Sequence, residues 1–302
     1  MNVFKDHVAF AAALETHPDY RVLRRLALPD VEGSGLEGAH HGSVLDVETT
    51  GLDVEQNDVV ELVVHPFMFR APREGEEGNA AFVRFFDPVR MLNEPRAPIP
   101  PEMTAIHGLT DADVAGHRIE EADLAAVGDS SVIIAHHAAY DRPFCEKLSP
   151  IFKAARWACS MNQVPWKANG FTSNSLENIC TRLGVFYDAH RATNDCAAVL
   201  YALGAMVGGK TGLQHLIEAT RRRFWHVFAV EAPFDSKERL KARGYQWSDG
   251  SAGLPKAWHK EIAHADRAAE ESWLSAHVYN YQTEPPWQFR EVTAKERFTS
   301  RG

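Results

Sequence analysis

The chain has 302 residues, with 32 Lys and Arg against 41 Asp and Glu, so its formal net charge is −9. Hydrophobic residues at 45% and charged residues at 24% are ordinary globular values, which excludes a disordered or fibrous chain. The length suits one large domain with a smaller one. The acidic balance argues against a protein that holds nucleic acid by bulk positive charge, but not against an enzyme that binds metal ions through carboxylates.

Features of membrane, secreted and disulfide-bonded proteins are not found. The longest apolar stretch, 196–207, is far shorter than the ~20 residues that span a bilayer. The N-terminal residues MNVFKDHVAF carry charges where a secretory signal needs an apolar core. We therefore expect a cytoplasmic protein with no membrane partner and with reduced, mostly buried thiols. The single cysteines are Cys145, Cys159, Cys180 and Cys196.

Residues 1–40 are predicted to form a helical extension followed by a linker. The apolar spacing from Phe4 to Leu14 predicts a short helix, and a second helical piece is expected over 19–28. The stretch 29–42 is polar and rich in glycine, which is typical of a linker.

Residues 41–210 alternate strand and helix signals, which predicts an α/β domain with a mixed sheet covered by helices. Asn174 and Glu177 have the spacing of a capping box, and Gly184 suits the end of the helix that they open. Further segments are predicted from apolar periodicity and turn residues. The strands are expected at 43–48, 59–69, 80–88 and 131–135, and the helices at 104–108, 110–115, 120–128, 141–148 and 194–207.

Residues 221–302 hold five of the seven tryptophans and are predicted to form a small α+β domain. A helix is expected between an Asp235 cap, with Glu238 three residues on, and Gly244. Other expected segments follow from strand and helix patterns. They are strands at 226–230, 245–247 and 256–258, a helix at 265–279 and an extended tail from 285.

Two interpretations of this C-terminal segment stay open. Basic residues beside exposed aromatic side chains favour a platform for single-stranded nucleic acid. A small domain also needs large aromatic residues simply to make a core. The residues concerned are Lys237, Arg239, Lys241, Arg243, Tyr245, Trp247 and Trp258. The run Arg221, Arg222 and Arg223 is likewise either a phosphate contact or a solvated charge cluster.

Asp46 and Glu48 are separated by one residue in the first strand of the central region. Because residues i and i+2 of a strand face the same way, both carboxylates project from one face. Two carboxylates held so close repel each other unless a cation lies between them. Taken alone, the pair also fits a solvated strand edge.

Three more residues extend this pattern. Asp141 follows the apolar strand at 131–135, at the corner where α/β sheets place ligand-binding groups, although it also suits a helix cap. Asp195 opens the last helix of the region, where burial of an unpaired carboxylate would cost several kcal/mol and a cation partner is expected. His190, five residues earlier, is able to take a proton from water near pH 7.

The segments LDVETTGL, AHHAAYD and HRATND resemble the three motifs of the DEDDh group of 3′–5′ exonucleases, which includes the proofreading subunit of the bacterial replicative polymerase, ribonuclease T and oligoribonuclease. The segment PPEMTAIHGLTDADV is similar to the "ihGit" loop of that group. The resemblance covers 41–210. It implies a ribonuclease H-like fold with a mixed five-stranded sheet flanked by helices.

Carried over residue by residue, the resemblance assigns metal binding to four carboxylates and general-base catalysis to one histidine. These residues are Asp46, Glu48, Asp141 and Asp195 for two Mg²⁺ or Mn²⁺ ions, and His190 for the base. It implies hydrolysis of terminal phosphodiester bonds at 3′ ends of single-stranded or frayed DNA or RNA, with DNA favoured. The products would be nucleoside monophosphates.

The resemblance also implies that the backbone at Thr49 and Thr50 and the side chain of Leu52 hold the terminal sugar and base. Stacking on apolar groups is tolerant of sequence, which fits a non-specific nuclease, while core packing is the alternative role for Leu52. The chain departs from the family at His137, where Asn is usual, and at Tyr140, where Phe is usual. Neither departure touches the five catalytic positions.

Two other functions stay open at this point. One keeps the fold and trims RNA 3′ ends or short oligoribonucleotides, because the motifs do not encode how a 2′-hydroxyl is treated. The other is a catalytically silent binding module in a polymerase or repair complex. The intact set of four acids and one histidine argues against a protein without catalytic activity. The motifs do not specify an oligomeric state.

Overall fold

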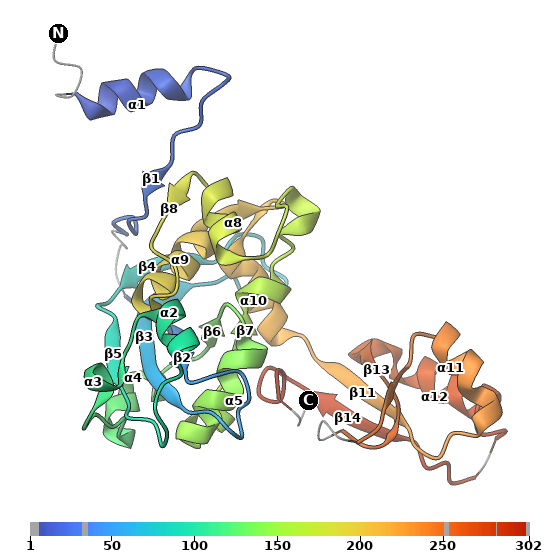
Figure 1. Cartoon of the computed structure of the whole chain (residues 1–302). Coiled ribbons are helices and arrows are strands. Elements are labelled where there is room, and N and C mark those ends of the chain that lie inside the picture. Colours follow the sequence, from blue (N-terminus) through green and yellow to red (C-terminus); the bar gives the residue numbers. More distant parts are fainter. Residues whose placement is uncertain (1–5, 32–35, 251–253, 282, 300–302) are drawn as a thin grey trace.

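The computed structural model describes residues 6–31, 36–250, 254–281 and 283–299 (Figure 1). A large lobe holds a mixed sheet with helices on both faces, and a smaller lobe holds a second sheet with two helices. The large lobe includes α10 (Gly212–Arg221), because Leu213, Leu216 and Ile217 belong to its core. We therefore propose to keep the division at 1–40, 41–210 and 221–302, with the central part extended to include α10.

The central sheet has the strand order β4-β3-β2-β6-β7, with β5 also paired to β3. β6 and β7 run parallel to β2, whereas β3 is antiparallel to β2, β4 and β5. The predicted mixed sheet flanked by helices is thus confirmed, with six strands instead of five. Its strands are β2 (His40–Thr49), β3 (Val59–Arg70), β4 (Ala81–Phe85), β5 (Val89–Leu92), β6 (Ile133–Ala135) and β7 (Trp157–Cys159).

The extra strand arises at Pro88. The segment expected as one strand over 80–88 ends at Phe85, and β5 begins at Val89 on the other side of the proline. Proline has no N–H to donate to a ladder, so it interrupts strand pairing. β4 and β5 consequently pair with different halves of β3 and share one edge of the sheet.

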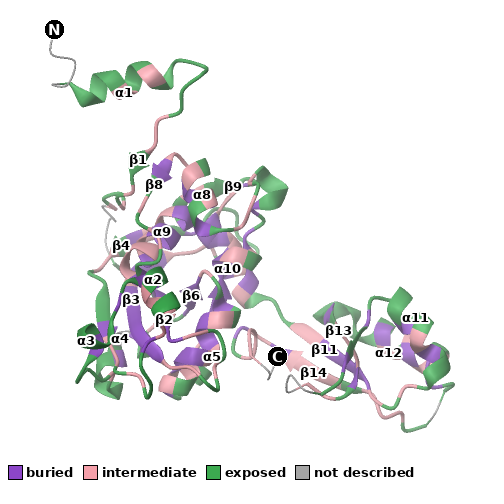
Figure 2. Cartoon of the chain, in the orientation of Figure 1, coloured by how far each residue is buried: buried purple, intermediate pink, exposed green. Residues whose placement is uncertain are grey.

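Alternating residues of β2 and β6 face two separate cores. Val44 and Ile134 pack with α8, α9 and α10 on one face, and Leu45 and Ile133 pack with α4, α5 and α6 on the other. These strands are therefore buried on both faces, as Figure 2 shows. The helices are α2 (Pro101–His107), α3 (Asp111–Val114), α4 (Ala125–Gly128), α5 (Ala138–Leu148), α6 (Ile151–Ala154), α7 (Ser160–Gln163), α8 (Leu176–Arg182) and α9 (Ala192–Gly204). Short 3₁₀ turns are η2 (Glu121–Leu124) and η3 (Lys167–Asn169).

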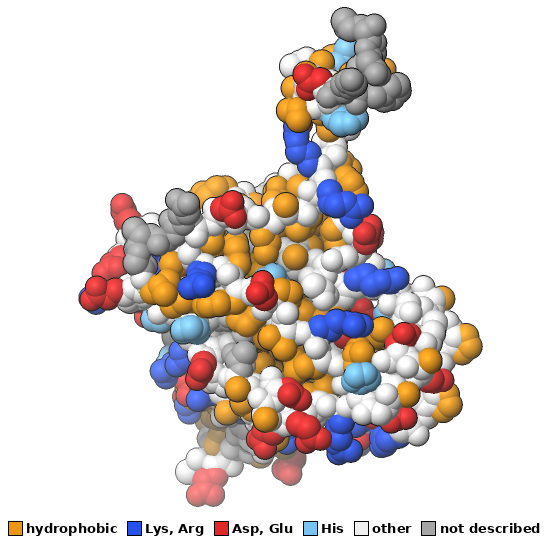
Figure 3. Space-filling view, turned by 90° about the vertical axis from the view of Figure 1, so that its left-hand side faces the viewer, with side chains coloured by type: hydrophobic (Ala, Val, Ile, Leu, Met, Phe, Trp, Pro, Cys, Tyr) orange, Lys and Arg blue, Asp and Glu red, His pale blue; other side chains and the backbone are white. Residues whose placement is uncertain are grey.

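The N-terminal helix α1 (His7–Glu15) has no buried residue and projects away from the larger lobe (Figures 1, 2 and 3). The predicted short helix is confirmed for these residues, while Phe4 lies outside the described part of the chain. Residues 32–35 of the predicted linker also lie outside it. Figure 3 shows the face at the left of Figure 1, where apolar side chains spread over the large lobe between scattered charges.

The second helical piece predicted over 19–28 is wrong. Its residues are extended, and β1 (Arg24–Arg25) pairs in parallel with β8 (Val185–Phe186). The reason is tertiary, because Leu26 and Leu28 pack against the core of the large lobe.

Two predicted helix caps are also wrong. Ser175, not Asn174, precedes α8, and the Asn174 amide donates to the Met161 carbonyl oxygen instead. Similarly, Asp235 does not cap α11 (Lys237–Ala242), because it belongs to a 3₁₀ turn, η4 (Phe234–Ser236). Ser236 precedes α11 instead, without a side-chain cap. The predicted glycine after α8 is confirmed, with a φ of 87° at Gly184.

Other boundaries shift by a few residues. α9 ends at Gly204 because residues after it turn into the hairpin of β9 (Met206–Val207) and β10 (Lys210–Thr211). The segment 120–128 begins as η2 before continuing as α4. No helix in the described ranges is long and apolar enough to cross a membrane. All four cysteines are buried and free, as predicted.

The smaller lobe is a four-stranded antiparallel sheet in the order β12-β13-β11-β14 with α11 and α12 against it. Its core includes Val227, Leu240, Tyr245 and Leu274. Four of the tryptophans pack against this core, which supports the packing interpretation for them, whereas Trp247 is 52% exposed. The elements are β11 (Phe224–Ala229), β12 (Gln246–Ser248), β13 (Ala257–Ala263), η5 (His264–Asp266), α12 (Arg267–His277) and β14 (Gln288–Val292).

Candidate active site

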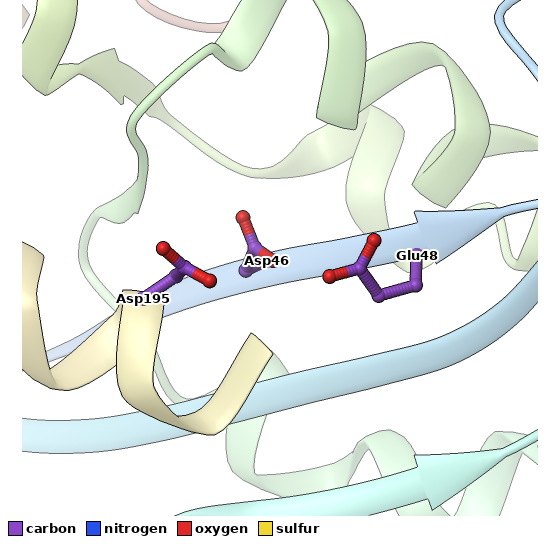
Figure 4. A group of neighbouring side chains, drawn as sticks. All are labelled: Asp46, Glu48 and Asp195. Atoms are coloured by element: carbon purple, nitrogen blue, oxygen red, sulfur yellow. The ribbon is translucent and has the colours of Figure 1, made fainter. Parts of the chain in front are cut away.

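Three carboxylates meet at the end of β2. Asp46 and Glu48 alternate along the strand and project from one face, and Asp195 comes from the first turn of α9 (Figure 4). One carboxylate oxygen of each lies within 4.8 Å of the others. The strand period of two, predicted from the sequence, therefore places Asp46 and Glu48 as expected.

Asp141 stands beside this group. It lies in the first turn of α5, not at the corner before the helix, because α5 already begins at Ala138. Its buried carboxylate interacts with the backbone of Val47 and lines the same cleft, of about 390 Å³, as the other three acids. The structure thus brings all four predicted acids to one cleft, with Asp141 outside the tightest group.

Without bound cations, the negative charges of the four acids repel one another. Burial, followed by the charges of Asp141, Asp195 and other acids, raises the pKa of Asp46 well above its usual range. Burial and the charges of neighbouring acids raise the pKa of Glu48 to about 8. Burial also raises the pKa of Asp141 and of Asp195. Such a set is stable in its charged form only with cations among its oxygens.

His190 lies on the turn before α9 and lines the same cleft with an exposed side chain. Its φ is 57°, in the left-handed region that a residue with a side chain rarely adopts. The Arg191 backbone N–H donates to the Asp195 carboxylate over 2.9 Å, and the Arg191 guanidinium donates to the His190 carbonyl oxygen over 2.7 Å. Neighbouring contacts thus hold this turn in its conformation.

The residues predicted to hold the terminal nucleotide, here called the rim, follow Glu48 closely along the chain. Thr49 and Thr50 are buried, and the Thr50 hydroxyl accepts from the Asp58 backbone N–H over 3.0 Å. Leu52 is 79% exposed, so the core-packing alternative for it is wrong. An exposed leucine beside a polar cleft is available to contact a ligand.

His137 and Tyr140, the two residues that depart from the family pattern, lie at the N-terminal end of α5. The Tyr140 hydroxyl is 2.5 Å from the Thr49 hydroxyl, and it also donates to the Gly51 carbonyl oxygen over 3.3 Å. The exposed His137 ring stacks on the Tyr140 ring with their centroids 6.0 Å apart. Tyr140 therefore connects α5 to the rim, which a phenylalanine does not do.

Sequence reasoning missed two partners of the site. The Tyr187 hydroxyl donates to the Asp195 carboxylate over 3.0 Å, and no spacing signal connects them because a turn separates them. Glu61 faces Glu48 across β2 and β3 and forms an ion pair with Arg90. The apolar run at the start of β3 offers a signal for Glu61, because this acid interrupts it.

His136 has a structural role. Its ring nitrogens contact the Ser160 hydroxyl at 2.8 Å and the Asn174 carbonyl oxygen at 2.9 Å. Burial lowers the pKa of His136 to about 4, so the ring is neutral near pH 7. These contacts make His136 a structural residue, although its ring lines the cleft.

The family model of the RNase_T exonucleases matches residues 43–203, just over half of the chain. A structure of exonuclease X in complex with 5′ overhanging duplex DNA is 24% identical, with 58% of this chain and 98% of that chain covered and a TM-score of 0.41. A structure of E. coli exonuclease I in complex with a dA16 oligonucleotide is 12% identical, with 74% and 63% covered and a TM-score of 0.45. None of the curated proteins compared with this chain matches it.

Proposed function

The chain belongs to the RNase_T exonuclease family and is a 3′–5′ exonuclease, and we propose that it shortens single-stranded or frayed nucleic acid, DNA in preference to RNA, to nucleoside monophosphates. The observation that carries this proposal is the meeting of Asp46, Glu48 and Asp195 within 4.8 Å in a cleft that His190 also lines. Phosphodiester hydrolysis needs a cluster of anionic ligands beside a group that accepts a proton.

The acids of the site fit two divalent cations, Mg²⁺ or Mn²⁺. All the predicted ligand atoms are carboxylate oxygens, which these hard cations prefer, and the burial and mutual repulsion that raise the pKa of Asp46 and Glu48 support bound positive charge. When bound, such a pair of cations supplies a nucleophile at neutral pH and offsets charge at the phosphate. The predicted ligands are Asp46, Glu48, Asp141 and Asp195.

His190 is the proposed general base. Its ring accepts the proton of the attacking water, the role that histidine fills most often in general acid–base catalysis. The turn that carries it is fixed by the bonds that Arg191 makes to the Asp195 carboxylate and to the His190 carbonyl oxygen. This arrangement leaves the imidazole exposed to the cleft while its backbone is held.

The rim residues are proposed to hold the terminal nucleotide. The exposed Leu52 side chain packs on the terminal base, and the backbone at Thr49 and Thr50 lies against the sugar. Contacts of this kind are made to any base, which suits an enzyme that removes successive nucleotides.

The test uses DNA and RNA oligomers of one sequence, labelled at the 5′ end, with Mg²⁺, Mn²⁺ or EDTA. We expect stepwise shortening from the 3′ end with either cation, none with EDTA, and faster shortening of DNA. Faster shortening of RNA would favour an RNA 3′-end trimming enzyme instead. No shortening of either oligomer would favour a silent binding module.

A variant tests the proposed base. His190→Ala is expected to lower kcat by ~10²–10⁴-fold, the usual contribution of a general base. Because the His190 side chain is exposed, the variant should keep the melting temperature of the wild type. His117→Ala, at an exposed histidine just after α3 that does not line the cleft, is the matched control. Turnover of His190→Ala at the wild-type rate would overturn the assignment.

A further inference from the structure

A second cleft, of about 790 Å³, lies between the large lobe and the C-terminal lobe. On the large lobe it is lined by His40 and Ser131, near the starts of β2 and β6, and by Arg156, just before β7. The other wall comes from His264 and from Lys295, beyond β14. The four predicted acids do not line this cleft. The second cleft lies at the end of β2 opposite to Glu48.

The lining of this cleft is strongly basic. Among its residues five are cationic and only one, Glu74, is anionic. The whole chain carries a net charge of −9, so this concentration of positive charge runs against the composition. The cations are Arg156, Arg221, Arg222, Arg223 and Lys295.

Part of this charge is available to a ligand. Glu218 lies 3.9 Å from Arg222, and Glu291 lies 3.3 Å from Arg223, so these two arginines have acidic partners. Among the described residues, no hydrogen bond or ion pair of the Arg156 or Lys295 side chain is found, and both are exposed. An anion in the cleft would therefore meet two cations without losing an internal ion pair.

Hydrogen bonds between the end of the chain and the large lobe hold the two walls of the cleft together. Arg142, which is 0% exposed, donates to the Arg297 carbonyl oxygen over 2.7 Å and also to the Lys295 carbonyl oxygen. Arg297 in turn donates to the carbonyl oxygens of Ala219 and Arg222 over 2.8 and 2.9 Å. The cleft is thus a formed feature and not a gap between loosely joined lobes.

We propose that this cleft binds the phosphodiester backbone of the single-stranded nucleic acid whose 3′ end is held at Asp46 and Glu48. This inference rests on the proposed function. His40, in the cleft wall, is six residues before Asp46 on β2, a span of ~20 Å at ~3.3 Å per residue. With a rise of ~3.4 Å per nucleotide along the axis of a stacked strand, at least about six nucleotides are needed to reach both sites.

The test compares Arg156→Ala/Lys295→Ala with the wild type. Binding of a 5′-fluorescent DNA 30-mer is measured by anisotropy in EDTA, where no cleavage occurs. We expect the double variant to bind about tenfold more weakly, from two exposed charge contacts. The slope of log K against log salt should shrink by about 1.4, because each phosphate contact in a single strand contributes ~0.7.

A matched control removes the same charge from the far part of the smaller lobe. Arg239→Ala/Lys256→Ala changes two exposed cations that do not line the cleft. We expect this control to bind the 30-mer as the wild type does. Equal losses in both double variants, or wild-type binding by Arg156→Ala/Lys295→Ala, would overturn the proposal.

Kinetics separate the cleft from the catalytic centre. With Mg²⁺, the cleft variant should show a raised KM for the 30-mer with unchanged kcat, and unchanged kcat and KM for a DNA 4-mer. An equal loss on the 4-mer would mean structural damage and would overturn the proposal. If the wild type shortens neither oligomer, the proposed function fails, while the binding measurement in EDTA still decides on the cleft.

Discussion

The hydroxyl oxygens of Tyr140 and Thr49 lie 2.5 Å apart, which connects the helix that carries Asp141 to the strand end that carries Glu48. The Tyr140 ring also packs on Phe144 and His137, so the hydroxyl is held at this position. Lys147, one to two turns later on the same helix, donates to the carbonyl oxygens of Val54 and Asn57. Helix α5 therefore fixes both the acid cluster and the loop after it.

Tyr140→Phe is expected to loosen the rim without unfolding the protein. The variant removes the partly buried hydrogen bonds of the Tyr140 hydroxyl to Thr49 and Gly51, each worth about 1 kcal/mol, and keeps the ring. Because the rim is proposed to hold the terminal nucleotide, we expect kcat/KM to fall about fivefold, mainly through KM. Steady-state kinetics on a DNA oligomer measure this. Tyr201→Phe, which removes the hydroxyl of a half-buried side chain on α9 outside the cleft, is the control, and a Tyr140→Phe enzyme with unchanged KM would contradict the role.

Arg191 is expected to act as a positioning residue for His190. Its guanidinium donates to the His190 carbonyl oxygen over 2.7 Å, which supports the left-handed backbone of that residue. Arg191→Ala should lower kcat about tenfold through the misplaced base. Binding of an oligomer in EDTA is the second readout and should stay within about twofold of the wild type. Arg191→Lys supplies a charge without the planar donor pair, so it should rescue activity only in part.

Gly108 lies against the Arg191 guanidinium, so a substitution there tests the contact between Arg191 and His190. Its φ is 78°, and a Cβ atom built there would lie 2.8 Å from a guanidinium nitrogen of Arg191. Gly108→Ala should therefore cost about 1 kcal/mol or more of stability and displace Arg191. Urea unfolding and kcat together measure the two effects. Gly116→Ala, with a φ of 74° and open space around its Cβ position, is the matched control for backbone strain alone.

The metal-free protein is expected to lose stability as the pH rises. The pKa of Glu48 is raised from 4.5 to about 8, so the folded state binds more protons than the unfolded chain between these values. The free energy of unfolding must then fall with pH over this window. Added Mg²⁺ or Mn²⁺ should reduce the fall, because cations stabilise the charged acids. Urea unfolding at pH 5.5 and pH 8, in EDTA and in Mg²⁺, measures both effects.

Glu48→Gln provides the control for this pH dependence. The variant removes one of the frustrated charges, so we expect a metal-free protein that is more stable at pH 8 than the wild type and a weaker stabilisation by Mg²⁺. A wild type whose stability in EDTA does not change between the two pH values would contradict the account of the cluster.

The parts of the site that follow from local periodicity were predictable from the sequence. Asp46 and Glu48 face one way because a strand repeats every two residues, and Asp195 lies in the first turn of the helix that its apolar pattern predicted. The apolar run over 59–69 likewise predicted the strand β3. Such features depend on neighbours along the chain.

The features that local patterns missed depend on distant partners. The strand β1 forms only because Val185 and Phe186 pair with it, and nothing between residues 19 and 28 signals that pairing. β7 has three residues, too few for a periodic signal, and is defined by its pairing with β6. Arg142 binds carbonyl groups more than 150 residues away, so its burial was not readable from the helix that contains it.

Arg142 also provides a prediction that joins the two lobes. The residue follows Asp141 on α5, is fully buried, and donates to the carbonyl groups of Lys295 and Arg297. Arg142→Met should leave these groups unpaired and cost about 3 kcal/mol or more, since each buried polar group without a partner costs ~1–3 kcal/mol. Urea unfolding of the full chain measures this loss.

Removal of residues 293–302 should cost stability by the same contact, because it leaves the buried Arg142 charge without its carbonyl partners. Arg142→Met and the removal of 293–302 abolish the same interaction. In a variant that combines them, the measured loss of stability should therefore be smaller than the sum of the two separate losses by about 1 kcal/mol or more. Strictly additive losses would show that Arg142 and the chain end act separately. Because Asp141 is adjacent to Arg142 on α5, the truncated protein should also have a lower kcat on the DNA 4-mer, which is too short to reach the basic cleft.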